Sequence, residues 1–352
     1  MDPVILALNC GSSSLKFGAY RVADGHPILA YEGEAEEIGR PCSPFPDHAA
    51  ALAHAFETIA KGNFEAITAV GHRIVHGGPR LREHQLLTPA LAEQLRQAVP
   101  FAPLHLPAAL SLIEIIRKKL PQVGQAICLD TAFHRHMPDV GRVFALPLAL
   151  RGLGIERFGF HGLSLESIVA QLDPLPERLV LAHLGNGSSI TAVRQGQSID
   201  TSMGLTPTGG IMMGTRCGDL DPGVLIYLMR HGYQDAEKLE ALVDHESGLL
   251  GISETTSDVR ELLAKRNQDA RADLALRMFA YQARKTVASM AAALGGLDAL
   301  VFTGGIGEHA ASLREEICSH LRFLGNFPIQ VLPAKEDLQI ARITAGLTKT
   351  AA

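Results

Sequence analysis

The chain has 352 residues, of which 47% are apolar and 20% are charged, and this balance predicts a folded protein of about two domains rather than a disordered or fibrous chain. Its 37 acidic and 32 basic residues are well mixed and leave a formal net charge of −5, so the sequence offers no basic surface for nucleic acid. We therefore expect a globular protein without a nucleic-acid partner.

The chain begins with an apolar segment at residues 4–8, a polar turn at 9–14 and a second β-type segment at 15–22. Before the first strand there is neither the basic region nor the long apolar stretch of a signal peptide or membrane anchor. The five cysteines are scattered and form no C-x-x-C pair, which argues against a disulfide framework and a zinc site. We expect a cytoplasmic protein that does not span a membrane.

A second strand, turn and strand unit follows at residues 179–184, 185–188 and 189–194. Its Gly187 and Gly11 of the first unit lie 176 positions apart, which is half the chain. Related units at this offset indicate an internal duplication.

The remaining elements alternate between helices and buried strands, which indicates a layered α/β architecture. Helical periodicity is predicted at 89–98, 107–120, 223–230, 236–243 and 270–294, and further strands are predicted at 126–130, 198–201 and 299–303.

Three glycine-rich turns follow apolar strands, at residues 9–14, 185–189 and 304–308. Because glycine lets the backbone approach an anion closely, each turn is a candidate phosphate cradle, and an ordinary tight turn is the alternative interpretation. None of them matches the G-x-x-x-x-G-K-[ST] loop, and the third is too short for a dinucleotide fingerprint.

Two arginines, Arg73 and Arg216, lie among small and apolar residues. The planar guanidinium matches the oxygens of a phosphate or carboxylate in pairs, and a structural ion pair is the alternative for each arginine. Asp130 ends a predicted strand and His161 lies in a loop, positions that are typical of sites in α/β enzymes.

Ten short motifs, in one order along the chain, carry a resemblance to a known family. They are NCGSSSLK at 9–16, GHRIVHGG at 71–78, APLH at 102–105, DTAFH at 130–134, GFHG at 159–162, HLGNGSS at 183–189, DTSMG at 200–204, MGTRCGDLDP at 213–222, GIS at 251–253 and GGIGE at 304–308. With them the chain resembles the acetate kinase family, which includes propionate and butyrate kinases and belongs to the superfamily of sugar kinases, heat-shock ATPases and actin.

The resemblance implies an α/β fold of two duplicated domains of the actin-like ATPase type, each a mixed β-sheet flanked by helices, with a nucleotide cleft between them. We expect an acyl and phosphate domain at residues 1–131, with 337–352 packing back on it, and a nucleotide-binding domain at 132–336. The resemblance also implies a homodimer. The activity that the resemblance implies is the reversible transfer of the ATP γ-phosphoryl group to acetate or another short-chain carboxylate. The products are an acyl phosphate (acetyl phosphate from acetate) and ADP.

Residue by residue, the resemblance implies that Arg73 and Arg216 grip the carboxylate and the phosphoryl group, that His161 steadies the transferring group, and that Asp130 orients an arginine or the acceptor. Mg²⁺ would be held near Asn9 and Glu336. ATP would contact Asn9, Lys16, His183, Gly185, Asn186, Gly187, Asp258, Arg260, Gly305, Ile306 and Gly307. The acyl group would lie against Arg73, Val75, Leu104, Phe160 and Pro207.

The chain departs from the family pattern at three places. Leu106 replaces an asparagine, Leu165 replaces a histidine, and Thr208-Gly209 replaces an apolar residue followed by glutamate. In one interpretation, the asparagine, histidine and glutamate of the family pattern bond one another, so that losing all three together is a structural change. In the other interpretation their loss reshapes the acceptor site.

Two other functions within the superfamily remain as alternatives to a carboxylate kinase. A sugar or polyol kinase needs an aspartate base for a hydroxyl and a polar pocket, whereas the implied pocket here is small and apolar beside arginines. An ATP-driven clamp predicts long insertions or a peptide-binding domain, and the sequence contains neither.

Overall fold

The structure is a computed structural model that describes residues 3–61, 67–103 and 105–350. The chain divides into two compact units. Unit 1 contains the described residues up to Arg135, Gly162–Ser167 and those from Lys335 onward, and unit 2 contains His136–His161 and Ile168–Ala334.

Unit 1 is built on one mixed sheet with the strand order β3-β2-β1-β4-β6-β5. The antiparallel pairs are β1–β2, β2–β3 and β5–β6, whereas β1–β4 and β4–β6 are parallel. The strands are β1 (Val4–Cys10), β2 (Leu15–Ala23), β3 (His26–Ala35), β4 (Ile67–Ile74), β5 (Gln85–Leu86) and β6 (Gly124–Leu129).

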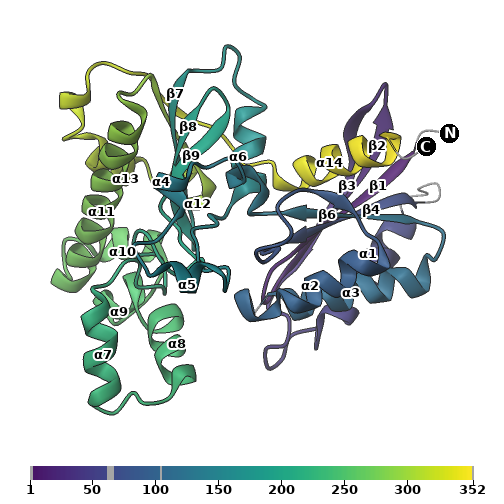
Figure 1. The fold of residues 1–352 in the computed structure, drawn as a ribbon, viewed down its shortest axis with the longest axis horizontal. Coiled ribbons are helices and arrows are strands. Elements are labelled where there is room, and N and C mark those ends of the chain that lie inside the picture. The colour runs from purple at the N-terminus through teal and green to yellow at the C-terminus, as the bar shows by residue number, and fades with distance from the viewer. Residues whose placement is uncertain (1–2, 62–66, 104, 351–352) are drawn as a thin grey trace. The chain divides into compact units, whose positions relative to one another are not determined.

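Helices cover both faces of this sheet (Figure 1). One face packs on α1 (His48–Lys61), α2 (Pro89–Gln97) and α3 (Leu106–Lys119), which with the sheet enclose the larger core of the unit. The other face packs on α14 (Glu336–Thr350). Because β1 is buried on both faces, its sequence VILALNC is a continuous run of buried side chains rather than an alternating one.

Unit 2 repeats this topology. Its sheet has the order β11-β10-β7-β8-β9, so that three antiparallel strands are again followed by two parallel ones. The strands are β7 (Arg178–Leu184), β8 (Ser188–Arg194), β9 (Gln197–Thr201), β10 (Ala299–Thr303) and β11 (Ile329–Val331). The predicted internal duplication and the α/β fold class are confirmed.

The long helix α11 (Ala270–Leu294) supplies much of the core of unit 2 through its alanine-rich buried face. The other helices of the unit are α4 (Asp139–Arg142), α5 (Leu148–Arg151), α7 (Pro222–Arg230), α8 (Ala236–His245), α9 (Gly248–Ser253), α10 (Val259–Lys265), α12 (Gly304–His309) and α13 (Ala311–Cys318). Helix α6 (Gly162–Val169) begins in unit 1. None of the helices in the described ranges has both the length and the apolar content needed to cross a bilayer.

Two of the glycine-rich turns differ from their prediction. Strand β1 extends through Asn9 and Cys10, because these residues pair with Lys16 and Leu15 in the β1–β2 ladder, so the first turn begins only at Gly11. The segment predicted as a turn at 304–308 is the start of helix α12, which follows β10 directly.

The contact of α14 with β4 depends on Gly71. A Cβ at this position would collide with the Thr344 hydroxyl and would lie 2.6 Å from Ile340 Cγ2, and both neighbours are fully buried. We predict that Gly71→Ala lowers the free energy of unfolding by about 1–3 kcal/mol, measured by urea denaturation. Gly124→Ala on β6 is the control, because its Cβ has no atom within 4 Å. Equal stability of the two variants would contradict this packing.

Candidate functional site

The parallel strands of unit 1 bring several polar residues to one edge of the sheet. Asn9 lies near the end of β1, Arg73 lies near the end of β4, and Asp130 directly follows β6. Glu336 and Asp337 begin α14 and bond to Asn9. We call these five residues the Arg73 cluster. The carboxyl ends of parallel strands meet at one edge, which is where α/β folds place their sites.

A buried ion pair forms the centre of the Arg73 cluster. Arg73 donates from Nε and Nη2 to Asp130 Oδ2 at 2.9 and 2.7 Å, and from Nη1 to Asn9 Oδ1 at 3.1 Å. Burial raises the pKa of Asp130, and the Arg73 guanidinium opposes this shift. Burial lowers the pKa of Arg73, but the charges of Asp130 and Glu336 outweigh it and hold this pKa above its usual value.

Two carboxylates converge on the amide nitrogen of Asn9. Asn9 Nδ2 donates to Glu336 Oε2 at 3.0 Å and to Asp337 Oδ1 at 2.9 Å. Burial raises the pKa of Asp337, and the neighbouring Glu336 adds to the shift. The sequence pattern did not indicate Asp337, although this residue follows Glu336 in an acidic pair at a helix start.

The chemistry of this donor set fits Mg²⁺, because a hard cation prefers oxygen ligands and is usually bound through one or two carboxylates together with substrate phosphates. No group of three or more His, Cys, Asp or Glu side chains arranged to hold a metal occurs in the described parts of the chain. Glu336 and Asp337 are therefore the candidate ligands. The oxygen of Asn9 faces Arg73 and its nitrogen faces the carboxylates, so a ligand role for Asn9 stays a prediction.

Unit 2 contains a second cluster around the turn between β7 and β8. A Cβ at Gly187 would lie 3.2 Å from both His161 Nε2 and Arg216 Nη1, so this glycine lets both side chains come close to the backbone. The His161 ring stacks on His183 with centroids 4.1 Å apart, and His161 Nδ1 lies 2.9 Å from Ser189 Oγ. We call His161, His183, Gly187 and Arg216 the Gly187 cluster.

The backbone at this cluster is held in unusual conformations. His161 has φ of +60°, in the left-handed region that few non-glycine residues adopt. The turn itself is closed by a hydrogen bond from Gly185 N to Gly187 O at 3.0 Å. Gly214 N donates to Asn186 O at 3.2 Å, which joins the turn to the loop that carries Arg216. Gly185, Asn186 and Gly187, predicted to contact phosphate, therefore form one ordered turn.

Arg216 donates from Nη1 to the carbonyl oxygen of Pro207 at 3.3 Å. The nearby acids Asp219 and Asp221 have backbone partners, because Asp219 Oδ1 accepts from Gly210 N at 2.7 Å and Asp221 caps helix α7. Asp219 and Asp221 thus each hold a local backbone group through one carboxylate oxygen.

The other residues predicted to contact ATP lie beside the two clusters or pair with one another. Asp258 caps helix α10 and pairs with the exposed Arg260 at 2.6 Å, which lowers the pKa of Asp258 to about 2. Lys16 lies opposite Asn9 in the β1–β2 ladder, and its Nζ is 3.6 Å from Glu34 on β3. Gly305, Ile306 and Gly307 lie in the first turns of α12, and a Cβ at Gly305 would meet no atom within 4 Å.

The predicted acyl-binding residues fall in both units. Val75 directly follows β4 and is buried in unit 1, whereas the buried Phe160 and the half-buried Pro207 belong to unit 2. Leu104 lies outside the described residues.

Comparison with known proteins gives consistent matches along the chain. Residues 4–338 match the model of the Acetokinase family. Acetate kinase of Rhodopseudomonas palustris is 42% identical over 354 residues, which cover 92% of this chain and 88% of that protein. The crystal structure of Porphyromonas gingivalis acetate kinase matches with a TM-score of 0.89 at 34% identity, and that of a propionate kinase from Francisella tularensis with 0.91 at 34%. Both comparisons cover 98% of this chain and 100% of the other.

The fold, the order of the motifs and these identities agree, and the chain therefore belongs to the acetokinase family, whose members are phosphotransferases that use ATP with Mg²⁺.

Proposed function

We propose that this chain transfers the γ-phosphoryl group of ATP reversibly to acetate, which gives acetyl phosphate and ADP. The observation that carries the proposal is the pair of arginine sites, one built around the Arg73–Asp130 ion pair and the other around Gly187. Family membership supplies the reaction type, and the names of the relatives supply acetate as the acceptor.

The chemistry of the acceptor explains why each cluster contains an arginine. A carboxylic acid with a pKa near ~4 is already ionised at neutral pH, so the acceptor needs no general base. Two anions must instead be brought together, and the loose transition state spreads negative charge over three equatorial oxygens of the phosphoryl group. Positioned hydrogen-bond donors therefore contribute more to catalysis here than a proton acceptor does. A single donor of this kind stabilises the transition state by roughly 3 kcal/mol.

In this proposal Arg73 binds the acceptor carboxylate, and Asp130 acts by fixing the plane of the guanidinium. Asp130 accepts from Nε and Nη2 of Arg73, which locks the fork in one orientation. Val75 directly follows the strand that carries Arg73 and contributes to the apolar wall around the acyl group, together with Phe160, Pro207 and Leu104.

Arg216 and His161 are assigned to the transferring phosphoryl group. When Ser189 donates to Nδ1 of His161, the proton of the neutral ring lies on Nε2, the atom that faces Gly187. The stacked His183 and the turn at Gly185–Gly187 hold the phosphate tail, and the start of α12 with Asp258 and Arg260 meets the adenosine. Glu336 and Asp337, oriented by Asn9, would hold Mg²⁺, which would neutralise charge on the phosphate oxygens.

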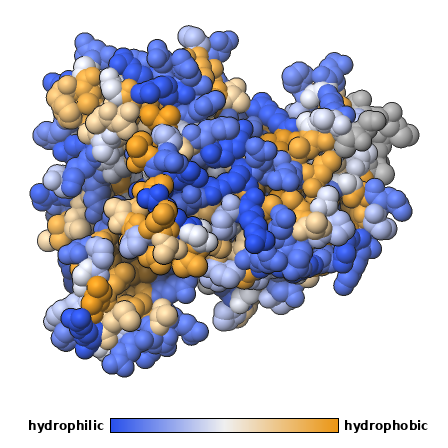
Figure 2. All heavy atoms as spheres, viewed as in Figure 1, coloured by the Kyte–Doolittle hydropathy of each residue, from blue (hydrophilic) through white to orange (hydrophobic). Residues whose placement is uncertain are grey.

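Residues 1–131 with 337–352 thus form the acyl and phosphate domain in this proposal, and 132–336 form the nucleotide-binding domain. We further propose that the chain is a cytoplasmic homodimer that binds neither nucleic acid nor a membrane. Helix α7 exposes Val224, Ile226, Tyr227 and Met229, and Figure 2 shows apolar surface over this helix. A second copy of the chain that covers this face would remove it from water.

A hydroxamate assay with ATP, Mg²⁺ and a series of acids from formate to butyrate tests the proposal. Acetate is expected to give the highest kcat/KM. A higher value for propionate or butyrate would assign the chain to that branch of the family. No hydroxamate from any acid, together with phosphorylation of glucose or glycerol, would replace the proposal with a sugar or polyol kinase.

The role of Arg216 is tested by Arg216→Lys, which keeps the charge but loses the bidentate fork. We predict a fall in kcat of roughly 10²-fold or more and a modest change in the KM for ATP. Arg178→Lys is the matched control, because Arg178 pairs with Asp298 in the same unit outside the Gly187 cluster. Normal single-turnover transfer from an Arg216→Lys protein with a lowered melting temperature would show that Arg216 is structural.

The role of Asp337 is tested by Asp337→Asn, which preserves shape and removes a charge. We predict that the Mg²⁺ concentration for half-maximal activity rises about tenfold. Burial raises the pKa of Asp337, so the folded protein disfavours the charged form, and the neutral asparagine should leave the melting temperature equal or higher at neutral pH. Glu36→Gln, at an exposed acid of unit 1, is the control. An unchanged Mg²⁺ titration would remove Asp337 from the metal site.

A further inference from the structure

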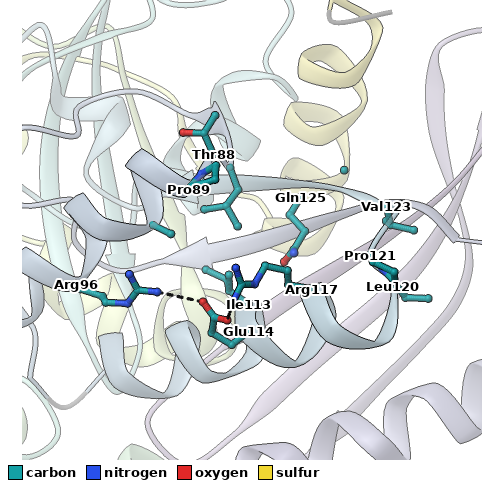
Figure 3. Close-up of a pocket in the computed structure, with 13 residues that line it drawn as sticks. Thr88, Pro89, Arg96, Ile113, Glu114, Arg117, Leu120, Pro121, Val123 and Gln125 are labelled. Carbon is teal, nitrogen blue, oxygen red and sulfur yellow. Dashed lines mark hydrogen bonds and ion pairs between the residues drawn. The ribbon is translucent and has the colours of Figure 1, made fainter.

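Unit 1 contains a cavity of approximately 330 Å³ that is separate from the Arg73 cluster (Figure 3). It lies between α2, α3 and the first residues of β6, whereas Asp130 follows the last residue of that strand. The six residues of β6 span about 20 Å at ~3.3 Å per residue. A cavity of this volume is at the lower end of the range for small-molecule sites.

The amide side chain of Gln125 points into this cavity. Gln125 is 7% exposed, and its Oε1 lies 2.8 Å from Nε2 of the buried His72. Within the described ranges its own Nε2 has no hydrogen-bond partner, and Figure 3 shows the side chain directed into the cavity. This amide nitrogen is therefore a hydrogen-bond donor that is available to a ligand in the cavity.

Two arginines on the wall supply further donors. Glu114 accepts from Arg96 Nη2 at 3.2 Å and from Arg117 Nη2 at 2.6 Å, so one carboxylate lies between two guanidinium groups (Figure 3). Arg96 also pairs with the exposed Glu93. Arg117 therefore has the N–H groups to spare, because its Nη1 and Nε make no hydrogen bond to the described residues.

The rest of the lining is largely apolar and consists of Leu87, Pro89, Ala92, Ile113, Leu120, Pro121 and Val123. The cavity thus presents donors at one end and hydrocarbon along its walls, and both oxygens of its one carboxylate are already engaged. We propose that this cavity is an effector site for a small organic carboxylate with a hydrocarbon body, whose oxygens meet Arg117 and Gln125.

The regulatory part of this proposal rests on the proposed function. His72, which bonds to Gln125, directly precedes Arg73 on β4. Burial lowers the pKa of His72 to about 4, so the ring is neutral and its hydrogen bond to Gln125 is a short, uncharged link. A ligand that binds Gln125 is therefore linked through the His72 side chain to the strand that carries Arg73, and the KM for the acceptor should change when the ligand binds.

Binding is tested by calorimetric titration of the full chain, without ATP, using cyclohexanecarboxylate as the probe. Ala92→Phe fills the cavity and Arg117→Gln removes the donor, and each is expected to raise Kd at least tenfold. Ala90→Phe on the same helix and Lys118→Gln on the same turn are exposed matched controls that should bind within twofold of the unchanged chain. No binding, or binding that neither Ala92→Phe nor Arg117→Gln weakens, would overturn the site.

Two further probes test the ligand class. Cyclohexanecarboxamide has the same body without the charge and is expected to bind at least tenfold more weakly. Equal binding of the amide would overturn the assignment to carboxylates, and tighter binding of inorganic phosphate would replace it with a phosphate site.

The link to Arg73 is tested by the KM for acetate with the probe at saturation. A change of at least twofold in the unchanged chain that disappears in Ala92→Phe supports the link. An unchanged KM would overturn it. The calorimetry needs no turnover, so it tests the cavity even where the hydroxamate assay contradicts the proposed acetate kinase activity.

Discussion

The organisation of unit 1 depends on one buried ion pair. Arg73 and Asp130 lie at the ends of adjacent parallel strands, where removal of either partner would leave an unpaired charge at a cost of about 3–5 kcal/mol. The pair does not stand alone, because the same guanidinium bonds Asn9, and Asn9 in turn bonds Glu336 and Asp337. The start of the last helix is thereby tied to the first strand, and hydrogen-bond donors and acceptors alternate along this path.

The two duplicated sheets have acquired different electrostatic character at equivalent places. In unit 1 the end of β1 carries Asn9, and the adjacent acids produce an environment that suits a cation. In unit 2 the corresponding strand β7 carries His183, and the turn that follows allows His161 and Arg216 to approach the backbone, which suits an anion. A common topology thus carries an acidic cluster at the end of β1 and a cluster of histidines and an arginine beside the turn after β7.

Local features of the fold could be predicted from the sequence because they depend on neighbours along the chain. Helix α11 and strand β10 begin and end at the predicted residues, and the glycine turn before β8 is where the pattern placed it. The prediction of a turn at 304–308 was wrong, because glycine at φ of +79° can also start a helix directly after a strand. The sequence pattern did not separate these two uses of Gly304.

Features that depend on distant contacts were less accessible to prediction. Asn9 and Asp337 are 328 positions apart, and no periodicity relates them, so Asp337 was missed although its neighbour Glu336 was found. The cavity beside Gln125 was missed for the same reason, since α2, α3 and β6 become its walls only when the sheet has formed. Asp258, in contrast, makes a contact that is local in the sequence. This residue was predicted to meet the adenosine, and its side chain also caps α10.

Three residues that depart from the family pattern, Leu106, Leu165 and Thr208, lie in surroundings that suit their side chains. Leu106 and Leu165 are fully buried in unit 1, and Leu106 belongs to the larger core cluster of that unit. An asparagine or histidine at these positions would need a hydrogen-bond partner in the interior, whereas leucine gains from burial. Thr208 has a polar partner of its own, because its hydroxyl donates to Asp244 at 2.6 Å. Leu106, Leu165 and Thr208 are therefore each accommodated by their own neighbours, which favours a joint structural change over a reshaped acceptor site.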